Sequence, residues 1–180
     1  MRRVLGLVAV ALALLGGAGC SRYPAAPDFT LTDQHGALWT LSAQHGKAVA
    51  LYFGFTHCPD TCPATVAKLA KAIGENGNAE IAFVTVDPQR DTPPVLDAFA
   101  QRFSGAPIIG LTGSPKQIAS VERAYHIWAQ KIPGKHGNYD YDEAHISIVT
   151  FIDANGRERG IADQDESVTT LASDIRSARQ

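Results

Sequence analysis

The chain has few of the residues that would indicate a disulfide scaffold or a nucleic-acid surface. It has only three cysteines among 180 residues, so they are expected to form a site rather than to staple the fold. Its 16 Lys and Arg are outnumbered by 18 Asp and Glu, and a net charge of −2 excludes a typical nucleic-acid partner. There are no internal repeats and no low-complexity segments. The 45% hydrophobic content is that of an ordinary globular protein with a proper core.

No apolar run is long enough for a comfortable membrane span, but the N-terminus predicts export. Residues 1–3 supply positive charge, Val4 to Leu15 are apolar, and Gly16 to Gly19 are small, which is the pattern of a secretory signal. Cys20 follows directly, as at a bacterial lipoprotein cleavage site. We therefore expect a mature chain that begins at a lipidated Cys20 and is anchored on the periplasmic side of a bacterial membrane. Plain secretion with an incidental cysteine and an uncleaved anchor are the alternatives.

The length predicts one domain behind this leader. Residues 1–19 are expected to be the signal peptide, residues 20–27 the lipidated cysteine and a proline-containing tether, and residues 28–180 the folded domain.

The order of apolar runs predicts an α/β fold with a central mixed sheet flanked by helices. Apolar strands at Val49 to Phe55 and Ile81 to Val86 enclose a helix from Pro63 to Gly74, which makes a βαβ unit with parallel strands. An N-terminal β-hairpin is expected within Asp28 to Leu41, around a turn at Gln34 to Gly36.

The remaining expected elements follow the same patterns. They are a helix from Pro93 to Phe103, a strand at Ile108 to Leu111, a helix from Ser114 to Ile127, a long loop from Trp128 to Ala144, a strand at Ile146 to Ile152 that His145 starts, a turn at Asn155-Gly156 and a helix from Glu166 to Arg179. Loops longer than about 12–15 residues are usually functional or mobile.

The stretch Thr56 to Pro63, Thr-His-Cys-Pro-Asp-Thr-Cys-Pro, lies between the first apolar strand and its helix. A helix N-terminus favours a thiolate. At a spacing of four residues on a helix, Cβ atoms are about 5–6 Å apart, so Cys58 and Cys62 can face one metal ion at zinc–thiolate distances of about 2.3 Å. A disulfide needs Cβ atoms about 3.8 Å apart, which a non-helical Cys58 still permits. Both metal binding and dithiol redox chemistry remain open.

Three ordered motifs resemble the SCO/SenC family of copper-binding proteins that assemble cytochrome oxidase. They are Gly54 to Pro63 (GFTHCPDTCP), Val84 to Pro93 (VTVDPQRDTP) and the single His145 before a strand. The resemblance runs from about Pro27 to the C-terminus. It implies a thioredoxin-like fold that binds one copper ion, Cu(I) or Cu(II), through Cys58, Cys62 and His145. The implied partner is the copper-bearing subunit of cytochrome c oxidase or another copper chaperone.

Several assignments keep alternatives. Zinc competes with copper for two thiolates and an imidazole, although three ligands favour copper. A thiol–disulfide oxidoreductase would use Cys58 to attack and Cys62 to resolve, and would reduce the copper-ligand cysteines of the client. Asp87 is either an acid just outside the metal ligands or a turn residue, whereas Asp91 is expected to be a turn residue and His57 a solvated loop side chain.

Overall fold

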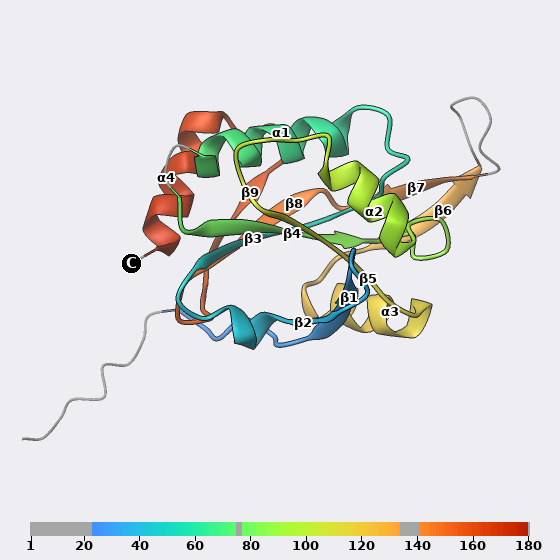
Figure 1. The fold of residues 1–180 in the computed structure, drawn as a ribbon, viewed down its shortest axis with the longest axis horizontal. Helices are drawn as coiled ribbons and strands as arrows, with labels where there is room; N and C mark the ends of the chain where they lie inside the picture. Colours follow the sequence, from blue (N-terminus) through green and yellow to red (C-terminus); the bar gives the residue numbers. More distant parts are fainter. Residues whose placement is uncertain (1–22, 75–76, 134–140, 180) are drawn as a thin grey trace, which may run out of the picture.

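A seven-stranded mixed sheet forms the centre of the protein (Figure 1). The structure is a computed structural model that describes residues 23–74, 77–133 and 141–179. The strand order is β2-β1-β5-β4-β3-β8-β9. These strands are β1 (Thr30–Asp33), β2 (Leu38–Thr40), β3 (Ala48–Gly54), β4 (Ala79–Thr85), β5 (Ile108–Thr112), β8 (Ile148–Ile152) and β9 (Glu158–Asp163). The predicted α/β fold with a central mixed sheet is confirmed.

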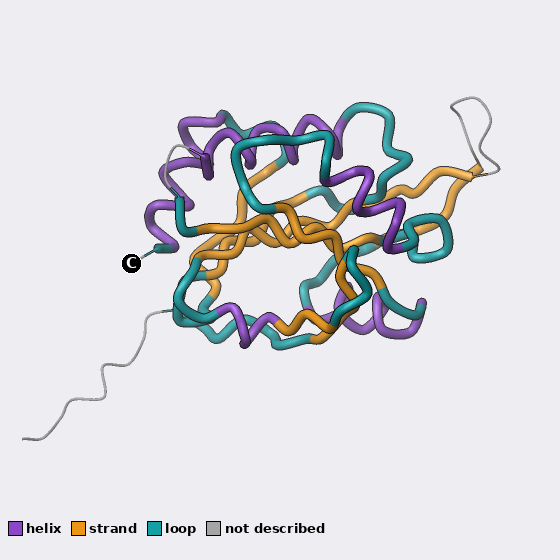
Figure 2. Tube along the Cα trace, in the orientation of Figure 1, coloured by secondary structure: helices purple, strands orange, loops and turns teal. Residues whose placement is uncertain are grey.

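Helices cover both faces of this sheet (Figures 1 and 2). They are α1 (Thr61–Gly74), α2 (Pro93–Ala100), α3 (Pro115–Ala124) and α4 (Val168–Ala178), with a short 3-10 helix at Leu41–Gln44. In Figure 1, α1 and α4 lie above the sheet, and α3 lies below it beside β1 and β2. The first helix buries Val66, Leu69 and Ile73, which are three and four residues apart and so share one face.

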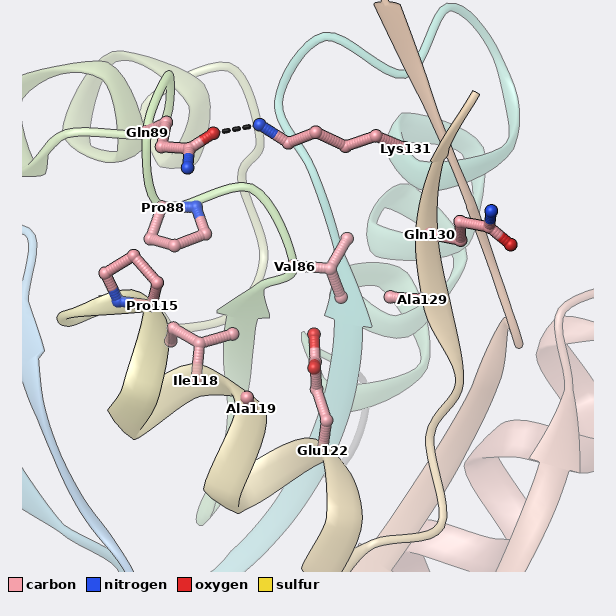
Figure 3. A pocket seen from close by; sticks show the side chains of 10 residues that line it. All are labelled: Val86, Pro88, Gln89, Pro115, Ile118, Ala119, Glu122, Ala129, Gln130 and Lys131. Carbon is pink, nitrogen blue, oxygen red and sulfur yellow. Dashed lines mark hydrogen bonds between the residues drawn. The ribbon is translucent and has the colours of Figure 1, made fainter. Parts of the chain in front are cut away.

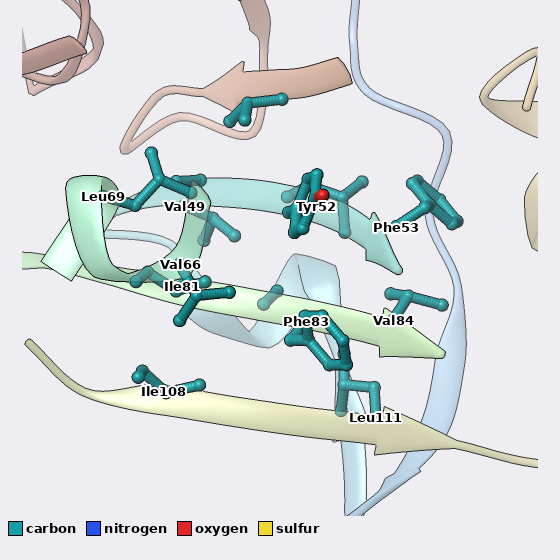
Figure 4. Packing of buried hydrophobic residues seen from close by; sticks show 14 of the residues in the cluster. Val49, Tyr52, Phe53, Val66, Leu69, Ile81, Phe83, Val84, Ile108 and Leu111 are labelled. Atoms are coloured by element: carbon teal, nitrogen blue, oxygen red, sulfur yellow. The ribbon is translucent and has the colours of Figure 1, made fainter. Parts of the chain in front are cut away.

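The core is built on the two neighbouring parallel strands β3 and β4 (Figure 4). Every residue of both strands is buried, which explains their nearly continuous apolar sequences. Tyr52 of β3 stands beside Phe83 of β4 in the parallel register, and Gly54 stands beside Thr85. The loops that follow these two strands therefore begin at the same edge of the sheet.

The predicted N-terminal hairpin is confirmed. Strands β1 and β2 pair antiparallel, and the turn uses Gly36 at a φ of 82°, where glycine is favoured. The side chain of Gln34 then connects the hairpin turn to β5. Its Nε2 donates to the carbonyl of Ile108 at 3.0 Å, and its Oε1 accepts from the amide of Gly110 at 2.9 Å.

The segment from Trp128 to Ala144 is not the long loop that its composition predicts. Strands β6 (Ala129–Pro133) and β7 (Tyr141–His145) pair antiparallel as a separate two-stranded sheet. His145 therefore ends β7 instead of starting the next strand, and β8 begins only at Ile148. The pairing was missed because neither segment alternates apolar and polar residues, which is the pattern that predicts a half-buried strand.

Several helix boundaries also differ from prediction, among them the start of the fourth helix, which is Val168 instead of Glu166. The first helix begins at Thr61, two residues before Pro63, because the main-chain carbonyl of Asp60 accepts the amide of Ala64 at 3.0 Å as the first helical hydrogen bond. The second ends at Ala100, where the chain turns, and the third ends at Ala124, just before His126 adopts a φ of 56°. The early start of α1 places Cys62 within its first turn.

No helix among residues 23–74, 77–133 and 141–179 is long and apolar enough to cross a membrane. The predicted signal peptide, Cys20 and the first residues of the tether lie outside the described residues.

Replacing Gln34 with alanine should lower the free energy of unfolding by about 1–3 kcal/mol, because it leaves buried main-chain partners on β5 without hydrogen bonds. Urea unfolding measures this change. Gln101→Ala is the matched control, since Gln101 makes a surface hydrogen bond to Asp97. Equal stability of the two variants would contradict the anchoring role of Gln34.

Candidate functional site

The loop between β3 and α1 brings Cys58 and Cys62 together, as their spacing predicts. Both are free thiols. The amide of Cys62 donates to the Sγ of Cys58 at 3.3 Å, while the amide of Cys58 donates to the carbonyl of Phe55 at 3.3 Å. Cys58 is partly exposed, whereas Cys62 is completely buried. The accessible sulfur is therefore held against the first turn of the helix.

The two thiols differ in acidity. Hydrogen bonding from the Cys62 side chain lowers the pKa of Cys58 to about 6, assisted by the Cys62 amide and opposed by partial burial and the charge of Asp60. The same hydrogen bond, together with burial, raises the pKa of Cys62. At neutral pH, Cys58 is therefore a thiolate and Cys62 a thiol. An exposed nucleophile beside a buried, protonated partner is suited to metal capture and to thiol exchange.

Gly54 makes room for the buried thiol. A Cβ atom at this position would lie 2.9 Å from Cε2 of Phe83 and 3.1 Å from the Sγ of Cys62. The lack of a side chain at the end of β3 lets the sulfur of Cys62 pack directly on the strand.

His145 lies at the end of β7 and packs on the base of the cysteine loop. Its ring meets that of Phe55 edge to face, with the centroids 5.7 Å apart. Its Nε2 is 3.1 Å from the Oγ of Ser147, which in turn is 3.5 Å from the hydroxyl of Tyr52. Burial raises the pKa of Tyr52, and the interaction of its hydroxyl with the Cys62 side chain raises it further. A line of polar groups, Ser147 and Tyr52, thus runs from His145 to the buried thiol.

The three predicted ligands do not converge on one point in this structure. Within the parts of the chain that the structure describes, no three His, Cys, Asp or Glu side chains are close enough to hold one ion. Binding through both cysteines and His145 therefore requires a rearrangement within the site. The donor set of two thiolates and one imidazole is the kind that copper and zinc prefer.

Asp91 has a larger part in the site than its sequence suggests. Its carboxylate is completely buried and accepts the amide of Thr56 at 2.9 Å, the hydroxyl of Thr56 at 2.6 Å and the hydroxyl of Thr85 at 2.6 Å. Its Oδ1 also lies 3.5 Å from Nδ1 of His57. The prediction of a turn residue was wrong, because the side chain bonds across 35 residues of sequence to the start of the cysteine loop.

His57 likewise differs from the solvated side chain predicted for it. Its side chain is 26% exposed, and Nδ1 is 3.1 Å from the hydroxyl of Thr56 as well as facing Asp91. The residue before the reactive cysteine is therefore held by the same anchor as the loop.

Asp87 reaches the site indirectly. It is completely buried, its carboxylate pairs with Arg90, and its amide donates to the hydroxyl of Thr85 at 2.9 Å. The guanidinium of Arg90 lies over the ring of Phe55 at 5.9 Å, and this ring also contacts His145. Asp87 is thus connected to the histidine through two side chains, and its influence on a metal stays a prediction.

A hollow of about 190 Å³ lies between α3 and β6 (Figure 3). Val86 and Ile118 supply apolar walls, and Glu122 points into the hollow from α3; burial raises the pKa of its carboxyl. Lys131 of β6 donates to Gln89 in the loop after β4. None of the lining residues is a cysteine or histidine. The hollow is relevant to the site because the contact between Lys131 and Gln89 connects the β6–β7 pair, which bears His145, to the turn at Asp87–Arg90.

The fold and the dithiol loop together define a thioredoxin-like protein. Residues 19–180 match the family model described as SCO1/SenC, and the chain belongs to this family. The SCO2-like protein of Rickettsia felis is 35% identical over 134 residues, which cover 72% of this chain and 65% of that protein. The chain therefore matches somewhat less than two thirds of this relative's length.

Solved structures give the same relationship. Bradyrhizobium japonicum ScoI with copper bound is 31% identical with a TM-score of 0.73, and covers 86% of this chain and 99% of its own. Arabidopsis thaliana ScoI with copper bound is 31% identical with a TM-score of 0.74, and the match covers 85% of this chain and 99% of that one. The predicted family and thioredoxin-like fold are confirmed.

The low pKa of Cys58 predicts early reactivity in a pH titration. The alkylation rate with neutral iodoacetamide should reach half its maximum near pH 6, because only the thiolate reacts. Mass spectrometry assigns the adduct to Cys58. In Cys62→Ala, which removes the side-chain hydrogen bond, the midpoint should move upward. A midpoint near the ordinary thiol value in the unaltered chain would refute the assignment.

Removing one acceptor oxygen of Asp91 should loosen the cysteine loop. We expect Asp91→Asn to lower the free energy of unfolding by about 1.5–3 kcal/mol, since a buried charged hydrogen bond is lost. Asp97→Asn, which alters a surface hydrogen bond to Gln101, should change stability by no more than about 0.5 kcal/mol. Chemical denaturation compares them, and equal losses would argue against the anchor.

Proposed function

We propose that this chain is a membrane-tethered periplasmic copper chaperone for the assembly of cytochrome c oxidase. It binds one copper ion through Cys58 and Cys62 as thiolates and through His145, and transfers it to the copper-bearing subunit or to another copper chaperone. The observation that carries the proposal is the accessible Cys58 thiolate, paired with Cys62 at the start of α1 while His145 packs on Phe55 at the base of the same loop.

The donor chemistry supports copper over its main rival. Thiolates and imidazole suit copper, and Cu(I) accepts three ligands or fewer, whereas structural zinc sites almost always have four. Two relatives that are 31% identical have solved structures with copper bound. Because Cys62 is a thiol at neutral pH, it must release its proton when it becomes a ligand.

The N-terminal sequence supports the location. A positive start, an apolar run and small residues directly before Cys20 favour export and lipidation of this cysteine. A short tether would then keep the copper site near membrane-bound clients.

The unequal acidity of the two thiols favours a second candidate, a thiol–disulfide reductase. In this reaction the Cys58 thiolate attacks a disulfide formed by two copper-ligand cysteines of the client, and one client sulfur leaves as a thiolate. Cys62 then loses its proton and attacks Cys58, which releases the second client sulfur. Two electrons pass to the client, which becomes a dithiol, while Cys58 and Cys62 end as a disulfide.

Metal binding by the reduced full chain under anaerobic conditions tests the proposal. We expect one tightly bound copper, which Cys58→Ala and Cys62→Ala abolish. His145→Ala should weaken binding by about tenfold or more, because even groups outside the ligand set typically change metal affinity about 10–100-fold. His35→Ala, in the exposed hairpin turn, is the control and should bind as the unaltered chain does.

Titrations with Cu(I), Cu(II) and Zn(II) identify the preferred ion. Unchanged copper affinity in all three site variants would place the metal elsewhere and overturn the ligand assignment. Absence of copper binding, together with a readily exchanged Cys58–Cys62 disulfide, would favour the reductase.

A further inference from the structure

A groove of about 440 Å³ opens beside Cys58. The cysteine loop, including Thr56 and Cys58, forms one wall. The other wall comes from α2 and the turn after it, including Val95, Phe99 and Arg102. The accessible sulfur of the site therefore faces a surface of mixed apolar and cationic character.

Arg102 is held in place at this groove. Its amide donates to the carbonyl of Phe99 at 3.2 Å. Its guanidinium lies over the ring of Phe99 at 5.5 Å and over that of Phe103 at 5.8 Å. Throughout residues 23–74, 77–133 and 141–179, no carboxylate forms an ion pair with Arg102. A stacked guanidinium loses little freedom when it binds a carboxylate with two parallel hydrogen bonds.

The charges around Cys58 are divided between two sides. The groove contains no acidic side chain, and Arg102 is its one permanently charged cation among the described residues. Asp60 instead lines a separate hollow with Thr61 and Lys68. An anionic partner therefore meets one permanent cation and no acidic side chain in the lining on the α2 side of the cysteine loop.

We propose that this groove receives a cysteine-bearing polypeptide segment with an acidic residue next to its cysteine. The carboxylate binds Arg102, and this places the partner's sulfur at Cys58. The inference rests on the proposed function, since both copper transfer between thiolates and disulfide reduction bring a partner's sulfur to Cys58. An open groove suits an extended chain better than a small thiol, because small-molecule sites usually bury about 70–90% of the ligand.

Three matched peptides test this recognition. Each has one cysteine flanked on both sides by Asp, Asn or Lys, with blocked ends, and each is activated as a mixed disulfide with 2-thiopyridine. The Cys58 thiolate attacks the peptide sulfur, so a Cys58–peptide disulfide forms. The peptide–pyridyl bond breaks, and pyridine-2-thiolate leaves and takes up a proton to give the absorbing pyridine-2-thione. Initial rates are measured with the reduced full chain at one pH, and mass spectrometry of Cys62→Ala, in which Cys62 cannot displace the peptide, assigns the adduct to Cys58.

The Asp peptide should react about 3–5-fold faster than the Asn peptide, as expected for one exposed ion pair, and the Lys peptide should be slowest. In Arg102→Gln the ratio of Asp to Asn rates should fall to about one, and Arg102→Lys should keep part of the preference. Arg123→Gln, on α3 and outside the groove, is the matched control and should keep the full ratio. Since both rates come from one sample, an error in protein concentration cannot imitate the result, and the preference that Arg102→Lys retains controls for unfolding, because an unfolded chain would show none.

Other outcomes overturn the proposal. Equal rates for the three peptides in the unaltered chain would exclude an anion subsite, and a preference that persists in Arg102→Gln would assign it to another residue. If the pyridyl disulfide of glutathione reacts as fast as the Asp peptide, the occupant is a small thiol and not a polypeptide. Copper stoichiometry of the unaltered chain is measured separately, so a failure of the proposed function is distinguishable from a failure of this docking site.

Discussion

The buried carboxylate of Asp91 joins the ends of two parallel strands and holds the cysteine loop between them. It accepts hydrogen bonds from Thr56 at the end of β3 and from Thr85 at the end of β4. A loop that must present a reactive sulfur needs a fixed start, because otherwise the position of Cys58 relative to α1 would vary. Satisfying the buried acid with several donors makes this arrangement stable in a setting of low polarity.

The same loop explains why metal transfer and thiol exchange are close chemical alternatives here. The hydrogen bond between the cysteines lowers the pKa of Cys58 and raises that of Cys62, so Cys58 is ready to attack or to bind while Cys62 stays protonated in the first turn of α1. Either reaction begins at Cys58 and requires the later deprotonation of Cys62. The physical difference between a chaperone and a reductase then lies in what approaches Cys58, and the groove bearing Arg102 beside this sulfur has no acidic side chain in its lining.

His145 belongs to a different sheet from β3, the strand that leads into the cysteine loop, so the site is built from separate elements. The β6–β7 pair carries the imidazole to Phe55, whose ring also contacts Arg90. Lys131 links the same strand pair to the turn after β4. The placement of the proposed third ligand thus depends on side-chain contacts between separate elements.

The sequence by itself determined the α/β fold, the buried strands, the N-terminal hairpin and the proximity of Cys58 to Cys62, because apolar runs, turn residues and helical spacing are local signals. Tertiary structure alone decided the rest. Asp91 binds Thr56, which lies 35 positions earlier in the chain. Ser147 and Tyr52 meet only because β8 packs beside β3. Strands β6 and β7 pair although neither has a hydrophobic pattern. Contacts between distant residues depend on how strands are ordered in the sheet, and side-chain periodicity along one segment contains no information about that order.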